Sequence, residues 1–308
     1  MRLALSTNWC NRRFERGEEI VDKALELGFS ALELGYNTTR EQAEGIRRRL
    51  DEMPVGSVHA FCPVPISAPQ GYPELYSLAS FSRPDRDLAR AFVVKNLEFA
   101  ASVGADVLVL HAGRVSFSSL WRIIDTAVLK SRLKAAKNDV AAPAYAKLLK
   151  KALALRRRNG RKMLDVFRAE MEGLSPVLDS LGVTLALENL PYLEGFPDEA
   201  ETEELLKALS GARVKGWFDT GHDRVRRMHG WTDAPAVPDP AHFAGMHVND
   251  IVDFSDDHFA PGFGKVDFAA LAGFAAKVPH VVFEPKEDVT EEDLRTGIRN
   301  YENAVNLA

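Results

Sequence analysis

The alternation of short apolar runs with longer amphipathic stretches constrains the fold of this chain more than any other feature of its sequence. Each apolar run ends in a polar loop, and most are followed by a stretch with apolar residues at helical spacing. The apolar runs are residues 2–6, 31–35, 55–60, 106–111, 183–189, 214–219, 244–250 and 280–284. We interpret them as buried parallel strands, because a crossover helix between two strands of one sheet makes those strands parallel.

Eight such units in 308 residues are typical of a closed barrel. Residues 1–308 are therefore expected to form one α/β domain, a (β/α)8 TIM barrel. A doubly wound open sheet is the alternative, but no GxGxxG follows the first strand. Two connections are longer than a minimal barrel needs: the loop 61–86 after the third strand, and a helical insertion of about residues 114–160 after the fourth.

The insertion is basic, although the whole chain has a formal net charge of −5. Between residues 114 and 172 there are 15 Lys and Arg side chains against 5 Asp and Glu. Such a segment can bind nucleic acid or an acidic partner. Apolar residues at helical spacing, such as Leu129 and Leu133, favour a solvated helical face instead. Nucleic acid is therefore the less favoured partner.

No apolar segment approaches the roughly 18 residues of a membrane span, and the N-terminus lacks the apolar core of a signal peptide. Cys10 and Cys62 are too few for a disulfide framework and have no CxxC spacing. These features predict a cytoplasmic protein with no membrane partner. The oligomeric state is left open, and a homo-oligomer is compatible with the sequence.

Imidazole and carboxylate side chains close several of the expected strands or lie in the loops that follow. They are His59, His111, Glu188, Asp219, His222, His247, Asp256, His258 and Glu284. In a barrel these strand ends open on one face, where the side chains converge. Burying them there is costly without a compensating cation. His242 and His280 lie at the other ends of their strands and are expected to play no part.

A mixed set of imidazoles and carboxylates suits zinc, manganese, iron or cobalt, and it is unsuited to an all-oxygen calcium site. Any single one of these residues is more often structural than a ligand, but nine at equivalent positions are hard to explain that way. The sequence thus predicts a centre of one to three divalent metal ions.

The segments LENLP, FDTGH, HVND, DDHFAPGFGKVDF and FEP, together with the two earlier histidines, resemble the xylose-isomerase-like barrel superfamily. That superfamily includes sugar-phosphate isomerases and epimerases and the endonuclease IV family. The resemblance covers essentially the whole chain except the insertion. By resemblance to the epimerases, one metal is held by Glu188, Asp219, His247 and Glu284. By resemblance to the endonucleases, three metals are held by all nine residues.

The chain departs from both branches. Typical epimerases have an arginine at about the place of His258, and the nucleases have DTCH and HLNDSK where this chain has DTGH and HVNDIV. The isomerase and epimerase branch is the closer fit. A trinuclear phosphodiesterase is the first alternative, and an oxidative enzyme with two or three irons is another. A binding protein on a decayed barrel is the least favoured, because no ligand has been lost.

The resulting prediction is a metal-dependent sugar or sugar-phosphate isomerase or epimerase with a small carbohydrate-like substrate. Glu188 and Glu284 are expected to exchange the substrate proton through a metal-stabilised enediolate. Glu33, Asn189 and Lys286 lie near the expected mouth and are predicted to bind the substrate.

Overall fold

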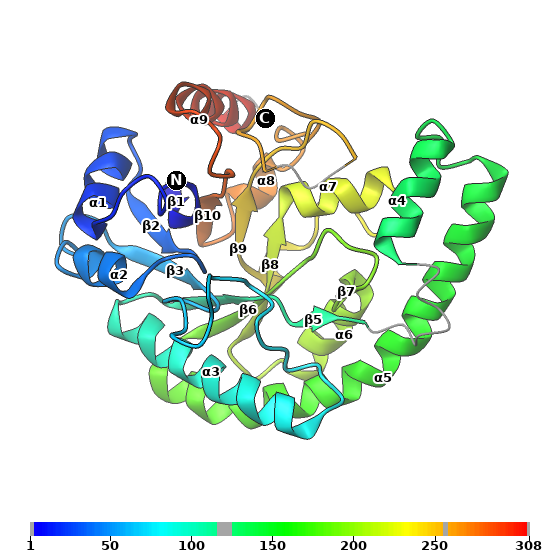
Figure 1. Ribbon diagram of the computed structural model, residues 1–308, viewed down its shortest axis with the longest axis horizontal. Coiled ribbons are helices and arrows are strands. Elements are labelled where there is room, and N and C mark those ends of the chain that lie inside the picture. Colours follow the sequence, from blue (N-terminus) through cyan, green and yellow to red (C-terminus); the bar gives the residue numbers. More distant parts are fainter. Residues whose placement is uncertain (1–2, 116–124, 255–257, 307–308) are drawn as a thin grey trace.

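The structure is a computed structural model, which describes residues 3–115, 125–254 and 258–306. Parallel strands close into a barrel in the order β1–β2–β3–β4–β6–β8–β9–β10, and β10 pairs back onto β1 (Figure 1). The strands are β1 (Leu3–Ser6), β2 (Ala31–Leu34), β3 (Val55–His59), β4 (Val107–Leu110), β6 (Thr184–Glu188), β8 (Val214–Asp219), β9 (Phe243–Val248) and β10 (His280–Phe283). The prediction of a (β/α)8 barrel is confirmed.

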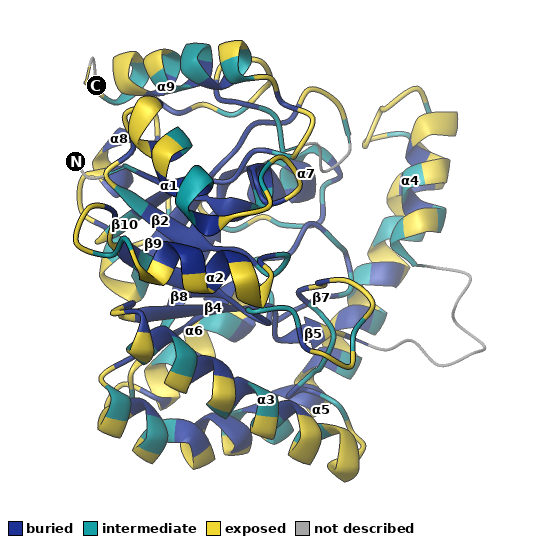
Figure 2. Ribbon diagram, turned by 60° about the vertical axis from the view of Figure 1, so that its left-hand side comes forward, coloured by how far each residue is buried: buried dark blue, intermediate teal, exposed yellow. Residues whose placement is uncertain are grey.

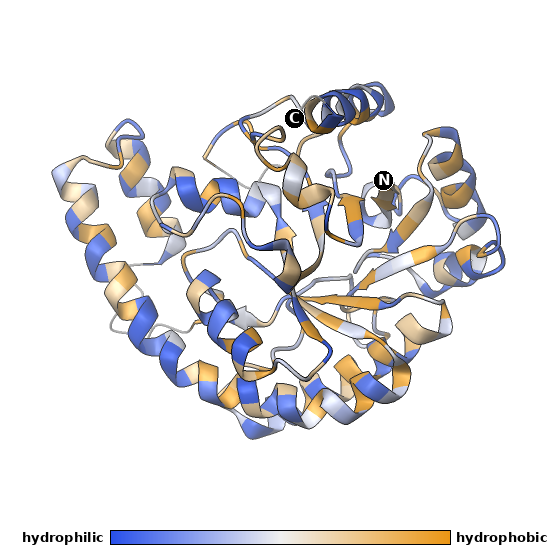
Figure 3. Cartoon of the chain, turned by 180° about the vertical axis from the view of Figure 1, so that it is seen from behind, coloured by the Kyte–Doolittle hydropathy of each residue, from blue (hydrophilic) through white to orange (hydrophobic). Residues whose placement is uncertain are grey.

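Helices surround the barrel, and their outer faces are largely hydrophilic, whereas the strands are apolar (Figure 3). They are α1 (Gly17–Glu26), α2 (Arg40–Arg47), α3 (Arg83–Ser102), α4 (Thr126–Ala135), α5 (Pro143–Leu181), α6 (Glu199–Ala208), α7 (Thr220–Met228), α8 (Ala272–Ala275) and α9 (Glu291–Asn306). None of the helices in the described ranges is long and apolar enough to span a membrane. Directly after β8, α7 begins at Thr220, where the Asp219 side chain caps its N-terminus.

Alternation along the strands separates two cores. Side chains of one parity form a small cluster inside the barrel: Ala4, Val107, Val109, Ala186, Trp217, Ala244 and Val282. Side chains of the other parity, such as Leu108, Leu185 and Phe283, pack against the helices in the main core. The next inward position after Ala186, Trp217 and Val282 is in each case one of the predicted ligands. The strand period thus places those ligands directly above the inner apolar cluster.

The described part of the insertion contains α4 and the start of α5, and α5 runs without interruption for 39 residues, past residue 160. A two-stranded antiparallel sheet, which the sequence did not indicate, pairs β5 (Gly113–Arg114) with β7 (Gly195–Phe196). Together α4 and the first half of α5 project beside the barrel (Figures 1 and 2). Their buried Leu129 and Leu133 pack with Trp231 and Ile251 in a separate apolar cluster.

Candidate metal centre

Eight of the nine predicted ligands lie in the described part of the chain, and they gather into three overlapping groups. In each group, one ligand atom per residue lies within 4.8 Å of the others. The groups are His59, His111 and Glu188; Glu188, Asp219, His247 and Glu284; and Asp219, His222 and His258. Asp256 lies outside the described residues, so its predicted role stays a prediction. The arrangement can hold metal at up to three neighbouring positions.

Glu188 is at the middle of this set and is almost fully buried, with 1% of its surface exposed. Its Oε2 lies 3.0 Å from His59 Nε2 and 3.1 Å from His111 Nε2, and its Oε1 lies 3.3 Å from His247 Nδ1. Burial alone would raise the pKa of this carboxyl, but the charges of His111 and His247 hold it well below its usual range. Each oxygen of Glu188 therefore contacts imidazole nitrogens of a different group, as a bridging carboxylate does.

The carboxylates have the reciprocal effect on the histidines. Burial opposes the charged form of His111, but Glu188 and Glu74 outweigh it and raise its pKa to about 8. The pKa of His247 is raised well above its usual value, against burial, by Glu284, Glu33 and Glu188. Without a metal, protons on these rings supply the positive charge that the carboxylates need.

Three of the histidine rings contact the backbone through Nδ1, and in His222 this nitrogen also lies 3.2 Å from Glu188 Oε1. The Nδ1 atoms of His59, His222 and His258 donate to the backbone carbonyls of Ala60, Asn189 and Glu284, at 2.9, 2.8 and 2.9 Å. A ring that donates from one nitrogen presents the lone pair of the other, which is the form that binds metal. The Nε2 atoms of His222 and His258 accordingly face each other at 3.3 Å. Two ring nitrogens so close are well suited to share a proton or a cation.

Asp219 combines a structural and a candidate ligand role. Its Oδ1 accepts the backbone N–H of His222 at 2.7 Å, which caps α7, and its Oδ2 accepts Asn249 Nδ2 at 2.7 Å. β8 and β9 pair in register at this level, with Asp219 opposite His247. One strand end and one helix start thus fix two ligands, Asp219 and His222, three residues apart.

The loop that carries His258 is held by Asp250, which follows β9. Asp250 is fully buried and accepts backbone N–H groups from Gly262, Gly264 and Val266 at 2.8–2.9 Å. His258 itself has a φ of +45°, a conformation that side chains other than glycine adopt only when their surroundings impose it. Two backbone contacts hold the chain here: Lys286 N–H donates to the His258 carbonyl at 2.8 Å, and Phe259 pairs with Asp250.

Two residues that the sequence reading overlooked also contact the set. Asn8 follows β1 and donates from Nδ2 to Glu284 Oε1 at 2.9 Å. A search for amide side chains, as well as imidazoles and carboxylates, directly after each strand would have identified it. Glu74 lies 3.6 Å from His111 Nδ1 and pairs with Arg114 at 2.6 Å. It belongs to the long loop after β3, and no local pattern in the sequence indicates its position.

The three predicted substrate-binding residues lie in different environments. Asn189 pairs with the backbone of Asp219 through both ends of its amide, at 2.7 and 3.0 Å. Lys286 lies over the Phe259 ring at 3.9 Å and 3.6 Å from Asp288. Glu33 is fully buried inside the barrel and contacts His247. Substrate contact by any of these residues stays a prediction, and the complete burial of Glu33 disfavours it there.

The remaining histidines lie apart from the centre. His280 opens β10 at the opposite end of the barrel, where its Nε2 lies 2.9 Å from Asp106. His242 is exposed in the turn before β9. His229 is buried, stacks on Trp231 at 4.3 Å and donates from Nδ1 to a carbonyl of α7. The described residues place none of the three in a candidate metal group.

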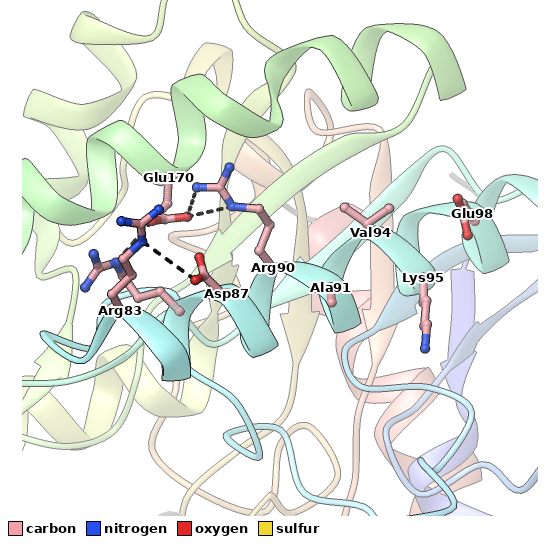
Figure 4. Close-up of a pocket in the computed structure, with 9 residues that line it drawn as sticks. Arg83, Asp87, Arg90, Ala91, Val94, Lys95, Glu98 and Glu170 are labelled. Carbon is pink, nitrogen blue, oxygen red and sulfur yellow. Dashed lines mark hydrogen bonds and ion pairs between the residues drawn. The ribbon is translucent and has the colours of Figure 1, made fainter.

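Two clefts on the outside of the barrel contain none of the candidate ligands. One of about 700 Å³ lies between α3 and α5, where Arg86 and Arg90 both hold Glu170 and Arg83 lies 3.8 Å from Asp87 (Figure 4). Another of about 590 Å³ lies beside α6 and α7. The predicted metal ligands thus line neither of these clefts, although Asn189, a predicted substrate-binding residue, lines the second.

Comparison with solved structures gives the same fold. A D-tagatose 3-epimerase-like protein is 17% identical, with a TM-score of 0.63, over 100% of this chain and 99% of its own. The 3-keto-D-glucoside 4-epimerase of E. coli is 16% identical, with a TM-score of 0.65, over 98% and 99%. A putative xylose isomerase from Rhodospirillum rubrum is 15% identical, with a TM-score of 0.66, over 100% and 99%.

No curated protein matches the sequence significantly. The family model described as xylose isomerase-like TIM barrel matches residues 21–302, nearly the whole chain and all but the first of its barrel strands. The resemblance predicted from the strand-end residues is thereby confirmed, and this chain belongs to the xylose isomerase-like TIM-barrel family.

Proposed function

We propose that this protein is a divalent-metal-dependent isomerase or epimerase acting on a small substrate of the sugar or sugar-phosphate class. The group formed by Glu188, Asp219, His247 and Glu284 carries the proposal, because four strand ends bring their ligand atoms within 4.8 Å of one another. A bound zinc, manganese, iron or cobalt ion would polarise the carbonyl and the adjacent hydroxyl of the substrate. The sugar epimerases that share the fold support the substrate class.

Glu188 and Glu284 are the groups proposed to move the substrate proton. They come from β6 and from the residue after β10, on either side of the strands that supply Asp219 and His247. One glutamate would remove the proton next to the carbonyl, and the other would return it to the opposite face of the enediolate. Asn8 holds Oε1 of Glu284 at 2.9 Å and so limits the rotation of this carboxylate.

The test measures exchange of substrate hydrogen with solvent deuterium by NMR, over a panel of ketoses, aldoses and their phosphates. Glu188→Gln and Glu284→Gln should each lower the exchange rate by on the order of 10²–10⁴-fold, since each removes a proton-transfer group. His280→Gln, at the other end of the barrel, is the matched control and should exchange at the wild-type rate. Wild-type exchange in either glutamate variant would refute the proton-transfer assignment.

A trinuclear phosphodiesterase-type hydrolase is the second candidate, and the position of Glu188 favours it. This carboxylate belongs to two of the three ligand groups, and His59, His111 and His258 extend the set beyond what one ion needs. With one divalent ion, three carboxylates leave a net charge of about −1, which suits a neutral sugar. With three ions and Asp256, the net charge is about +2, which attracts a phosphate.

Metal analysis combined with substrate assays separates the candidates. About one ion per chain with hydrogen exchange on sugars supports the isomerase. About three ions per chain with cleavage of bis-p-nitrophenyl phosphate or of abasic DNA supports the hydrolase. A coloured, iron-loaded protein that consumes oxygen would point to the oxidative alternative, whereas a colourless zinc or manganese protein dismisses it.

A further inference from the structure

Glu33 is a fully buried carboxylate that forms an ion pair with His247. It lies on β2, one inward position beyond Ala31, and 0% of its surface is exposed. Its two carboxylate oxygens lie 3.0 and 3.1 Å from His247 Nε2, and Ser57 donates to Oε2 at 2.8 Å. A buried carboxylate is stable only when its oxygens are satisfied in this way.

His247 differs from the other candidate ligands in the nitrogen that it presents. Its Nδ1 lies 3.1 Å from Glu284 Oε2 and 3.3 Å from Glu188 Oε1, whereas the four other rings place Nε2 in the shared space. A proton held on Nε2 by Glu33 leaves the lone pair of Nδ1 toward Glu188, Asp219 and Glu284. The choice of nitrogen is thus made by a residue that no substrate can reach.

Glu74 gives an internal comparison for Glu33. It also faces the outer nitrogen of a candidate ligand, His111, but at 3.6 Å, which exceeds a hydrogen-bond distance. Its carboxylate is directed instead to Arg114, at 2.6 and 3.1 Å. The two carboxylates therefore occupy similar places behind two rings, and only one of them bonds to its ring.

We propose that Glu33 is a positioning residue that fixes His247 with its proton on Nε2, so that Nδ1 binds the metal of the Glu188, Asp219, His247 and Glu284 group. The inference rests on the proposed metal-dependent function and assigns Glu33 no contact with substrate. A carboxylate behind a ligating histidine orients the ring and strengthens its donor nitrogen, and loss of such a partner weakens metal binding by about 10–100-fold.

The first experiment measures the dissociation constant of zinc by competition with a chromophoric chelator. Glu33→Gln, which keeps the volume and removes the charge, should bind zinc about 10–100-fold more weakly than wild type. Glu33→Asp, which restores the charge on a shorter side chain, should recover part of the affinity. The matched control, Glu170→Gln, should change the constant by less than about 3-fold, since Glu170 is also a nearly buried carboxylate but pairs with Arg86 and Arg90 between α3 and α5.

The second readout is the NMR signal of the His247 Nε2–H in the zinc-loaded, ¹⁵N-histidine-labelled protein. A strong hydrogen bond to a carboxylate shifts this proton downfield, so Glu33→Gln should move it upfield and Glu170→Gln should not. Should Glu33→Gln fail to fold, Ser57→Ala removes the second donor to Glu33 and should move the same signal by a smaller amount.

The outcomes separate this inference from the function on which it rests. Wild-type protein that binds no divalent ion would refute the metal-dependent function itself. Wild-type protein that binds zinc while Glu33→Gln binds it equally well, with an unmoved His247 signal, would refute only the role of Glu33.

Discussion

Two layers of side chains inside the barrel lie two residues apart on the same strands and differ in almost every property. The lower layer contains Ala186, Trp217 and Val282, which are apolar members of one buried cluster, and the Trp217 ring also contacts the ring of His247 at 5.1 Å. The upper layer contains Glu188, Asp219 and Glu284, which are carboxylates surrounded by imidazoles. The lower layer stabilises the fold by burial. The upper layer requires either protons or metal ions to offset its charge. Two residues along each strand therefore separate the apolar layer that stabilises the barrel from the carboxylate layer that is proposed to bind metal.

Replacing a lower-layer side chain should give the largest change in stability. Trp217→Ala removes a ring that is 0% exposed, and it should lower the free energy of unfolding by about 3–5 kcal/mol. Urea unfolding of chelator-treated protein measures this loss. Asp219→Asn, two residues further along β8, is the comparison: it should abolish tight metal binding with a much smaller loss of stability. Equal destabilisation by both changes would remove the distinction between the layers.

The upper layer should also make stability depend on pH once metal is removed. The folded-state pKa of His111 is raised to about 8, so its contribution is complete below the unfolded value of about 6.5 and is lost as pH rises through 8. His247 is shifted in the same direction. For metal-free protein, the free energy of unfolding should fall by on the order of 1–2 kcal/mol between pH 6.5 and 8.5 from His111 alone.

Metal-loaded protein should show the opposite slope over this range, because protons compete with metal for the same rings and are lost as the pH rises. Thermal melts at matched ionic strength, with and without chelator, measure both slopes. Parallel curves would indicate that the rings of the upper layer do not bind the ion.

The smallest effect is expected at the opposite end of the strands. His280→Gln breaks a pair with Asp106 in which the Asp106 side chain is 68% exposed, and pairs of this kind contribute roughly 0–1 kcal/mol. The free energy of unfolding should change within that range, and the zinc dissociation constant should not change. Weaker zinc binding in this variant would place a ligand at an end of the barrel where none is expected.

The sequence predicted the barrel and the ligand groups because both depend on local periodicity. Glu188 and His247 lie at or next to the ends of their strands, which fixes their level along the barrel axis. Closure of the barrel then brings side chains at the same level close together. The complete burial of Glu33 could not be predicted, for a related reason. The sequence places it on the inward face of β2, but its depth depends on the register between β2 and β3, which shifts after Leu32.

Contacts made by irregular segments were beyond sequence reasoning. Glu74 reaches His111 from a long loop whose path is set by tertiary packing, and Asp250 organises the chain around Gly262 through backbone bonds. The unbroken course of α5 through the predicted boundary near residue 160 also depends on context. Its first half packs on α4 and its second half on α3, and the helix continues through Asn159 and Gly160, a pair that in sequence alone favours a turn.

The most direct test of the metal centre is the metal content of the purified protein, measured by elemental analysis after loading with zinc or manganese and removal of unbound ions. Wild type should retain at least one divalent ion per chain, and Glu188→Gln should lose it or retain fewer ions, since Glu188 belongs to two ligand groups. Wild-type protein that retains no ion, or a Glu188→Gln variant that retains as many as wild type, would contradict a centre built around this carboxylate.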